Sequence, residues 1–167
     1  ALIGVRVEGS TNSVDQRIKR LSKELDLLEN EYSVLDVEQS NIFWKKTKNL
    51  EVFSNTKKNL IRVVVPVSET LNLLQKLKNV DLSYFLDWGG SLIWLELNDI
   101  SIKILNELKD ITKDHNGYFT LIKVEEDMKA AADIFTIDPI KYKISEKIKK
   151  SFDPRRIFNP GKMYTGI

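Results

Sequence analysis

Few residues in this sequence have the chemistry of a catalytic or metal-binding site. His115 is the only histidine and there is no cysteine, so the chain offers neither a histidine-based metal site nor a thiolate ligand or nucleophile. His115 falls at the end of an expected helix, where a donor or cation is favourable, and this indicates a structural or solvated side chain. Glu125, Glu126 and Asp127 are adjacent, and adjacent side chains do not converge on one substrate atom, so we interpret them as a solvated loop.

Asp87, beside Trp88 at the end of an expected strand, leaves two interpretations open. A buried carboxylate there would be a candidate functional group. The alternative, which we favour, is that its side-chain oxygen closes the turn before Gly89. We also expect Trp88 and Trp94 to be core residues rather than the lining of a ligand pocket. Motifs for phosphate loops, dinucleotide binding and serine nucleophiles do not occur, so the sequence predicts no catalytic residue and no metal site.

The strongest local signal is the stretch FDPRRIFNPGKMY, from Phe152 to Tyr164. Pro154, Pro160 and Gly161 favour turns, and the residues before the two prolines are expected to be extended. The apolar side chains of the stretch need a surface to pack on, and its cations lie beside them. Two interpretations are equally favoured: a stiff segment that binds an anionic ligand or a neighbouring domain, and a strap across the domain's own core with its cations in water.

The elements that would position these residues form an α+β domain. Between Asn59 and Val124 the pattern predicts strands at 59–66, 82–88, 91–97 and 117–124, with a helix after the first and another after the third. Gly89 and Gly90 join the middle two strands in a hairpin turn that needs positive φ. The βαββαβ order is the ferredoxin-like unit, a mostly antiparallel sheet with helices on one face. Strands at 2–8 and 32–37, each followed by a helix, would add βαβα and extend this domain over 1–124.

Cap residues and apolar spacing give the expected helix boundaries. Asp36 and Gln39 have the spacing of a capping box. Ser68 is expected to cap a helix that carries the apolar side chains Leu71, Leu74 and Leu77. Asn98 or Asp99 is expected to cap the helix that follows the hairpin. Residues 125–167 would add a connector, a basic helix and the C-terminal strap to the same domain.

The basic helix has one narrow apolar stripe. Asp138 and Pro139 have the residue types of a cap and a first helical position. Apolar residues then recur every four positions, with lysines around them: Ile140, Ile144, Ile148 and Phe152. Between residues 141 and 162 there are eight Lys or Arg and two acidic residues, a net charge of +6, whereas the whole chain carries only +2. The positive charge is therefore concentrated near the C-terminus.

Two classes of partner are disfavoured by composition. No apolar run approaches the roughly 20 residues that span a bilayer, so we expect no direct membrane insertion. The net charge is close to balanced, so the chain has no overall positive potential that would attract nucleic acids. The central strands also lack the basic and aromatic signature with which ferredoxin-like sheets stack RNA bases, so we expect no nucleic-acid partner.

Three stretches carry a family resemblance. FDPRRIFNPGKMY resembles the C-terminal signature of FAD-linked oxidases of the vanillyl-alcohol-oxidase type. FLDWGGSLIWLEL looks like the D-W-G-G hairpin of one branch, the flavin-binding subunit of bacterial glycolate oxidase. VRVEGS, at residues 5–10, is similar to the opening strand of that branch's C-terminal domain. The three matches occur in family order and span almost the whole chain.

The resemblance implies a C-terminal cap domain whose N-terminal FAD domain lies upstream of residue 1. Consistent with this expectation, the chain opens without Met inside a strand-like pattern. The resemblance places Asn159, Gly161 and Lys162 near the flavin or the domain interface. The implied partners are the chain's own FAD domain, a catalytic flavoprotein subunit and an iron–sulfur subunit. The implied location of the chain is the cytoplasm, with association to the inner face of the cell membrane through those partners.

The implied reaction is oxidation of a 2-hydroxy acid such as glycolate, with hydride passing to FAD. The catalytic subunit of that branch carries a histidine-rich stretch, whereas this chain has only His115, which places it nearer the accessory flavin subunit. We expect the isolated chain to be inactive. The alternative is a free-standing ferredoxin-like interaction module that docks through its basic tail.

Overall fold

The computed structural model describes residues 2–28, 31–53, 58–124, 128, 133–162 and 164, which fall into two compact units. Unit 1 is Ala1–Ser54 and unit 2 is Asn55–Ile167. Within the described ranges, no helix has the length and apolar content needed to cross a bilayer.

Unit 1 is helical in its described residues. Its elements are α1 (Thr11–Glu24), α2 (Val37–Lys48) and a 3-10 turn, η1 (Glu51–Phe53). The capping box expected at the start of α2 is confirmed. The Asp36 carboxylate accepts a hydrogen bond from the Gln39 amide at 2.8 Å, and the Gln39 side chain accepts one from the Asp36 amide at 3.2 Å.

The strands expected at 2–8 and 32–37 are wrong. Neither segment belongs to the sheet, and unit 1 forms no strand within its described residues. The apolar side chains of the first segment remain in solvent, with Leu2 85% and Ile3 87% exposed. Alternation favours a strand only where a neighbouring strand takes up the backbone hydrogen bonds, and here none does. The extra βαβα is therefore reduced to its two helices.

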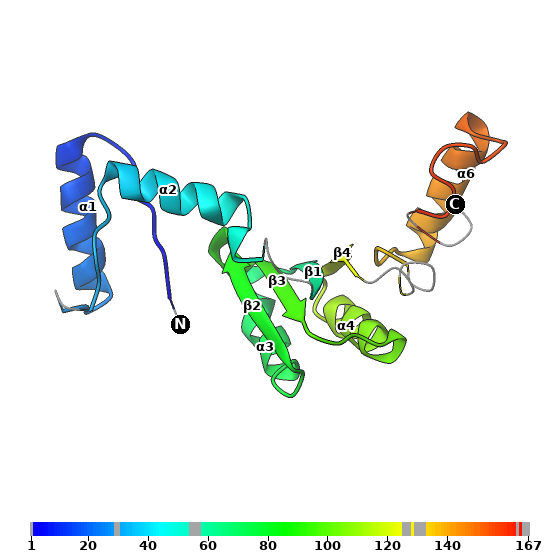
Figure 1. The fold of residues 1–167 in the computed structure, drawn as a ribbon, viewed down its shortest axis with the longest axis horizontal. Coiled ribbons are helices and arrows are strands. Elements are labelled where there is room, and N and C mark those ends of the chain that lie inside the picture. The colour runs from blue at the N-terminus through cyan, green and yellow to red at the C-terminus, as the bar shows by residue number, and fades with distance from the viewer. Residues whose placement is uncertain are drawn as a thin grey trace. The chain divides into compact units, whose positions relative to one another are not determined.

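Unit 2 contains the ferredoxin-like arrangement that the sequence predicts (Figure 1). Its strands are β1 (Asn59–Val64), β2 (Leu82–Asp87), β3 (Leu92–Leu97) and β4 (Tyr118–Lys123), in the order β2-β3-β1-β4 with every neighbouring pair antiparallel. The helices α3 (Thr70–Lys76) and α4 (Ile102–Asp114) follow the first and third strands, and α6 (Pro139–Phe152) follows the sheet. The α+β class is confirmed.

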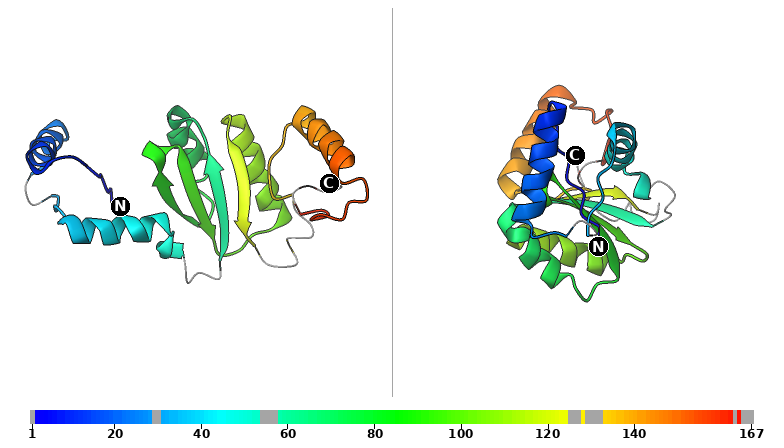
Figure 2. Two further views of the ribbon diagram at one scale, coloured as in Figure 1. Left: turned by 90° about the horizontal axis from the view of Figure 1, so that it is seen from above. Right: turned by 90° about the vertical axis from the view of Figure 1, so that its left-hand side faces the viewer.

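The two helices α3 and α4 cover one face of this sheet (Figure 2). Successive strand residues point to opposite faces, so every second residue enters the core. From the central strand β1 these are Ile61 and Val63, both fully buried, and they pair with Leu95 and Ile93 on β3. Phe119 completes the same row from β4. The other face receives no helix from this βαββαβ unit.

Two predicted helix caps are wrong. Ser68 lies inside a 3-10 turn, η2 (Val67–Glu69), and α3 begins after it at Thr70. The helix after the hairpin is capped by Ser101, whose hydroxyl accepts a hydrogen bond from the Ile104 amide at 3.2 Å, rather than by Asn98 or Asp99. The cap of α3 moves by one residue, to Glu69, and the cap of α4 by two or three. Several polar residues stand close together at both helix starts, and local sequence does not choose among them.

The segment after β4 joins the sheet edge before it enters α6. Phe135 forms a β-bridge with Thr120, and the Leu121 amide donates to the Ile134 carbonyl at 2.8 Å. The acidic triplet at 125–127 lies outside the described residues. The cap expected for α6 is confirmed, since the Asp138 carboxylate accepts a hydrogen bond from the Ile140 amide at 2.8 Å.

The face that α3 turns inward yields a direct test. Leu73 and Leu77 are buried and Leu74 packs on the core, whereas Leu71 is 71% exposed. Leu73→Ala should lower the free energy of unfolding by about 2–5 kcal/mol, because it leaves a cavity. Leu71→Ala, the same change two residues away, should stay within about 0.5 kcal/mol of wild type. Denaturant unfolding measures both, and equal losses would contradict the assigned helix face.

Candidate functional site

The C-terminal tail is fastened to the end of α6 by one carboxylate. Asp153, only 6% exposed, accepts hydrogen bonds from the Ile157 amide at 2.9 Å and the Phe158 amide at 3.0 Å. Lys149, one turn earlier, places its ammonium 2.7 Å from the same carboxylate and also donates to the Phe158 carbonyl. We call this set, Lys149, Asp153, Ile157 and Phe158, the tail clasp.

The clasp shifts the ionisation of its carboxylate. The hydrogen bond from Lys149 lowers the pKa of Asp153 from 3.8 to about 2, against the opposing effect of desolvation. The two backbone amides add to the lowering, because they too favour the charged form. The carboxylate is therefore charged at neutral pH and holds the backbone of the tail in place.

The side chains of the tail are not covered in the same way. Phe152 is 85%, Ile157 63% and Phe158 69% exposed. Between α6 and the tail lies an open groove of about 500 Å³, whose apolar lining includes Ile148 and Tyr164. The tail thus combines a fixed backbone with exposed apolar side chains.

The three predicted site residues lie together in the turn after the clasp. Asn159 has φ +46° and Gly161 has φ +68°, and the Lys162 amide donates to the Asn159 carbonyl at 3.3 Å. All three are exposed. The expectation that Asn159 is extended before Pro160 is wrong, since it is left-handed. Asparagine tolerates this conformation better than most residues.

The face of the sheet opposite α3 and α4 carries a second candidate surface, which the sequence analysis missed. In the cross-strand register, Arg62 stands between Trp94 on β3 and Thr120 on β4, and Trp94 stands beside Phe85 on β2. These four residues form one row across the sheet. The sequence pattern that could have revealed this surface is the alternation in β1, which puts Arg62 on the face opposite Ile61 and Val63.

The hairpin turn brings a further aromatic ring to this row. The Arg62 guanidinium lies 5.4 Å from the centroid of the Trp88 ring, a cation–π contact. Trp88 is 58% exposed and Trp94 is half-buried, so neither tryptophan is the core residue we expected. The favoured interpretation of Asp87 is confirmed, because its carboxylate accepts a hydrogen bond from the Trp88 amide at 2.7 Å and so closes the turn. We call Arg62, Phe85, Trp88 and Trp94 the Arg62 cluster.

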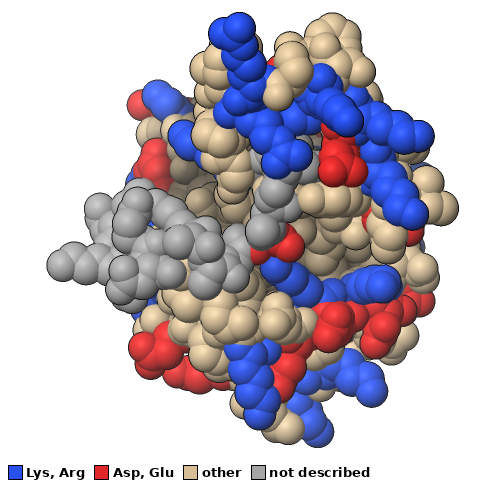
Figure 3. Space-filling model, turned by 90° about the vertical axis from the view of Figure 1, so that its right-hand side faces the viewer, with Lys and Arg blue, Asp and Glu red and all other residues tan. Residues whose placement is uncertain are grey.

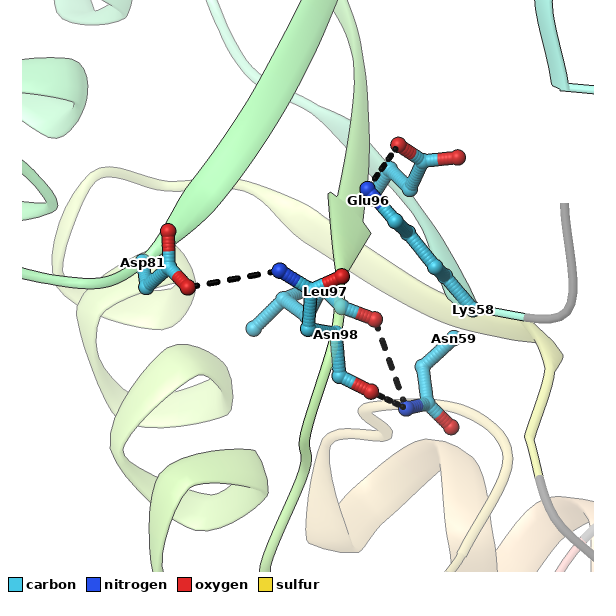
Figure 4. Close-up of polar contacts among 6 residues, drawn as sticks. All are labelled: Lys58, Asn59, Asp81, Glu96, Leu97 and Asn98. Carbon is cyan, nitrogen blue, oxygen red and sulfur yellow. Dashed lines mark hydrogen bonds and ion pairs between the residues drawn. The ribbon is translucent and has the colours of Figure 1, made fainter.

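Polar contacts connect the strands at the end of the sheet that lies away from the Trp88 turn (Figure 4). Lys58 forms an ion pair with Glu96 at 3.2 Å, and the Asn98 amide group donates to Asp81 at 3.3 Å. Asn59, 4% exposed, donates to the carbonyls of Leu97 and Asn98 at 3.4 Å each. Glu96, the acidic residue of β3, is therefore already paired.

His115 is structural, which agrees with the sequence analysis. It caps the C-terminus of α4, and its Nδ1 atom lies 2.8 Å from Glu69 at the end of η2. The contact lowers the pKa of Glu69, with the hydrogen bond from His115 as the main cause. The described residues contain no group of three or more ligating side chains that would hold a metal ion.

Comparison with known proteins returned no relative: no family model, curated protein or solved structure matches the chain. The tail clasp and the Arg62 cluster are the candidate functional surfaces of the described residues.

Acid should open the tail clasp. Because the folded pKa of Asp153 is about 2 and its ordinary value is 3.8, the clasp stabilises the tail fully above the ordinary value and loses this effect as the pH falls towards 2. NMR amide shifts of Ile157 and Phe158 should follow that titration. Asp153→Asn should release both amides at neutral pH, whereas Glu146→Gln, an exposed acidic residue of α6, should not. Amides that stay in place in Asp153→Asn would contradict the clasp.

Proposed function

We propose that the chain is the C-terminal cap domain of an FAD-dependent oxidoreductase subunit of glycolate-oxidase type, and that it helps to cover the flavin and substrate site. The observation that carries this proposal is the tail itself. Its backbone is fastened by Asp153 while Ile157 and Phe158 remain in solvent. A segment arranged in this way has the form of one half of an interface.

A protein surface suits the other half of this interface, because it would bury the exposed apolar side chains of the tail. Fully burying a side chain such as Ile157 or Phe158 stabilises a complex by about 1.5–3 kcal/mol each. Because the clasp already fixes the backbone, less conformational entropy is lost when the tail docks. The turn at Asn159 and Gly161 follows directly, which supports the expectation from the family resemblance that these residues approach the flavin domain.

Charge complementarity supports an anionic partner surface. Lys and Arg side chains gather over α6 and the tail (Figure 3). On α6 itself they include Lys143, Lys147 and Lys150, all exposed, and Lys162 follows in the tail. Such a field accelerates association with an acidic surface and disfavours a second copy of the same basic face.

FAD would be held mainly by the domain upstream of residue 1, and only the tail of this chain would reach it. The exposed donors Asn159 and Lys162 suit that role, since amide and ammonium groups can donate to flavin oxygens or phosphates. The chemistry that bound FAD would supply is acceptance of hydride from a 2-hydroxy acid. The residues of this chain would contribute position and electrostatics, which are the protein's usual share in cofactor chemistry.

A free-standing interaction module would use the same apolar and basic surface. The two functions differ in what precedes residue 1. An open reading frame that encodes an FAD-binding domain supports the cap domain, whereas a start codon directly before residue 1 would overturn that proposal and favour the module.

Flavin retention tests the cap-domain proposal. The chain, joined to the FAD domain encoded upstream, should purify as a yellow protein with flavin absorbance. Phe158→Ser should lower the fraction of protein with bound flavin by about tenfold, because it removes one apolar anchor of the interface. Leu71→Ser, an equally exposed apolar residue on α3, is the matched control and should leave flavin absorbance unchanged. A colourless wild type, or equal effects of both changes, would contradict the proposal.

A further inference from the structure

Arg62 is half-buried, and among the described residues its guanidinium has no acidic partner. No carboxylate of the described residues lies within ion-pair distance of its guanidinium. The two acidic side chains on its face of the sheet are engaged elsewhere, Asp87 with the Trp88 amide and Glu96 with Lys58. A partly desolvated charge costs free energy unless it is paired. Arg62 has only the cation–π contact with Trp88, so its guanidinium is a candidate site for an anionic ligand.

Trp88 is held beside this cation in an unfavourable backbone conformation. Its φ of +53° is left-handed, and for a bulky residue this costs about 1–2 kcal/mol. Besides the hydrogen bond to Asp87, two side-chain hydrogen bonds hold the turn: the Thr70 hydroxyl donates to the Gly90 carbonyl at 2.8 Å, and the Ser91 hydroxyl donates to the Trp88 carbonyl at 3.2 Å. The surrounding structure thus keeps a large indole ring over Arg62 with more than half of its surface in solvent.

We propose that the Arg62 cluster is a binding site for a flat, ring-bearing anion. The guanidinium of Arg62 pairs with a carboxylate or phosphate of the ligand, and the ring of the ligand packs against the indoles of Trp88 and Trp94. This site lies on the sheet, away from the tail clasp, and the proposal holds for a cap domain and for an interaction module alike.

The chemistry of the cluster selects this ligand class. A guanidinium presents a planar fork of donors that matches two oxygens of a carboxylate or phosphate, which an ammonium group does not. The aromatic residues Phe85, Trp88 and Trp94 offer π surfaces on which a planar ring stacks. A small anion without a ring would use only Arg62, and a neutral ring would use only the indoles. Both should therefore bind more weakly than a molecule that carries the two groups together.

Four small probes separate these contributions in the full chain. Benzoate and phenyl phosphate carry both groups and distinguish carboxylate from phosphate, benzamide is the neutral ring, and acetate is the anion without a ring. The readout is the NMR shift of the tryptophan indole N–H groups. Benzoate or phenyl phosphate should shift Trp88 and Trp94 but not Trp44, which belongs to unit 1. Benzamide and acetate should bind at least about tenfold more weakly.

Variants assign the binding to named side chains. Arg62→Gln should weaken binding of the better anion by about tenfold or more, and Arg62→Lys should recover it only in part. Trp88→Leu should weaken the binding of the ring-bearing probes but leave the binding of acetate unchanged. If an Arg62 variant does not fold, the Trp88→Leu result decides the test. Lys76→Gln on α3 removes one positive charge, as Arg62→Gln does, but from a helix on the other face of the sheet. It should have no effect on the binding of the probes. Equal binding of benzoate and benzamide, unshifted indoles, or equal losses in Lys76→Gln and Arg62→Gln would overturn the proposal.

Discussion

The alternation of side chains along β1 is the constraint on which the structure of unit 2 depends. Ile61 and Val63 enter the core between the sheet and its two helices, and the same geometry forces Arg62 to the other face. A shift of one residue in the register would bury the arginine and expose both aliphatic side chains. The core and the Arg62 cluster therefore follow from one pairing of strands.

The arrangement of the sheet was largely predictable because its signals are local and agree with one another. Four alternating runs, a Gly-Gly turn and two amphipathic helices point to one topology, and the structure has it. Segment 2–8, which alternates, and segment 32–37 were also predicted as strands, yet they form none. Whether a partner strand stands beside such a segment is a tertiary property that the local sequence pattern does not contain.

The candidate sites were predictable to different degrees. Breaker residues marked the tail, so its turns were visible in the sequence. The roles of Asp153 and Lys149 were not, because they depend on a chain reversal that brings the Ile157 and Phe158 amides back to the carboxylate. Arg62 was visible as a residue on the second face, but its proximity to Trp88 arises only when the hairpin turn folds over the sheet.

Both candidate surfaces use the same local device, an aspartate that accepts hydrogen bonds from backbone amides at a left-handed turn. Asp87 accepts from Trp88, which has positive φ, and Asp153 fastens a tail that contains Arg156 and Asn159 at positive φ. A side chain with a β-carbon disfavours this conformation by about 1–2 kcal/mol per residue. Strain of this kind persists where neighbouring bonds fix the backbone, and it is concentrated at sites that present side chains to a partner. Positive φ also occurs at Asp26, Leu50 and Asn116, which follow α1, α2 and α4, so this conformation alone does not mark a binding surface. The two candidate surfaces differ because the fixed turn there stands beside large aromatic or apolar side chains in solvent, Trp88 in one case and Ile157 and Phe158 in the other.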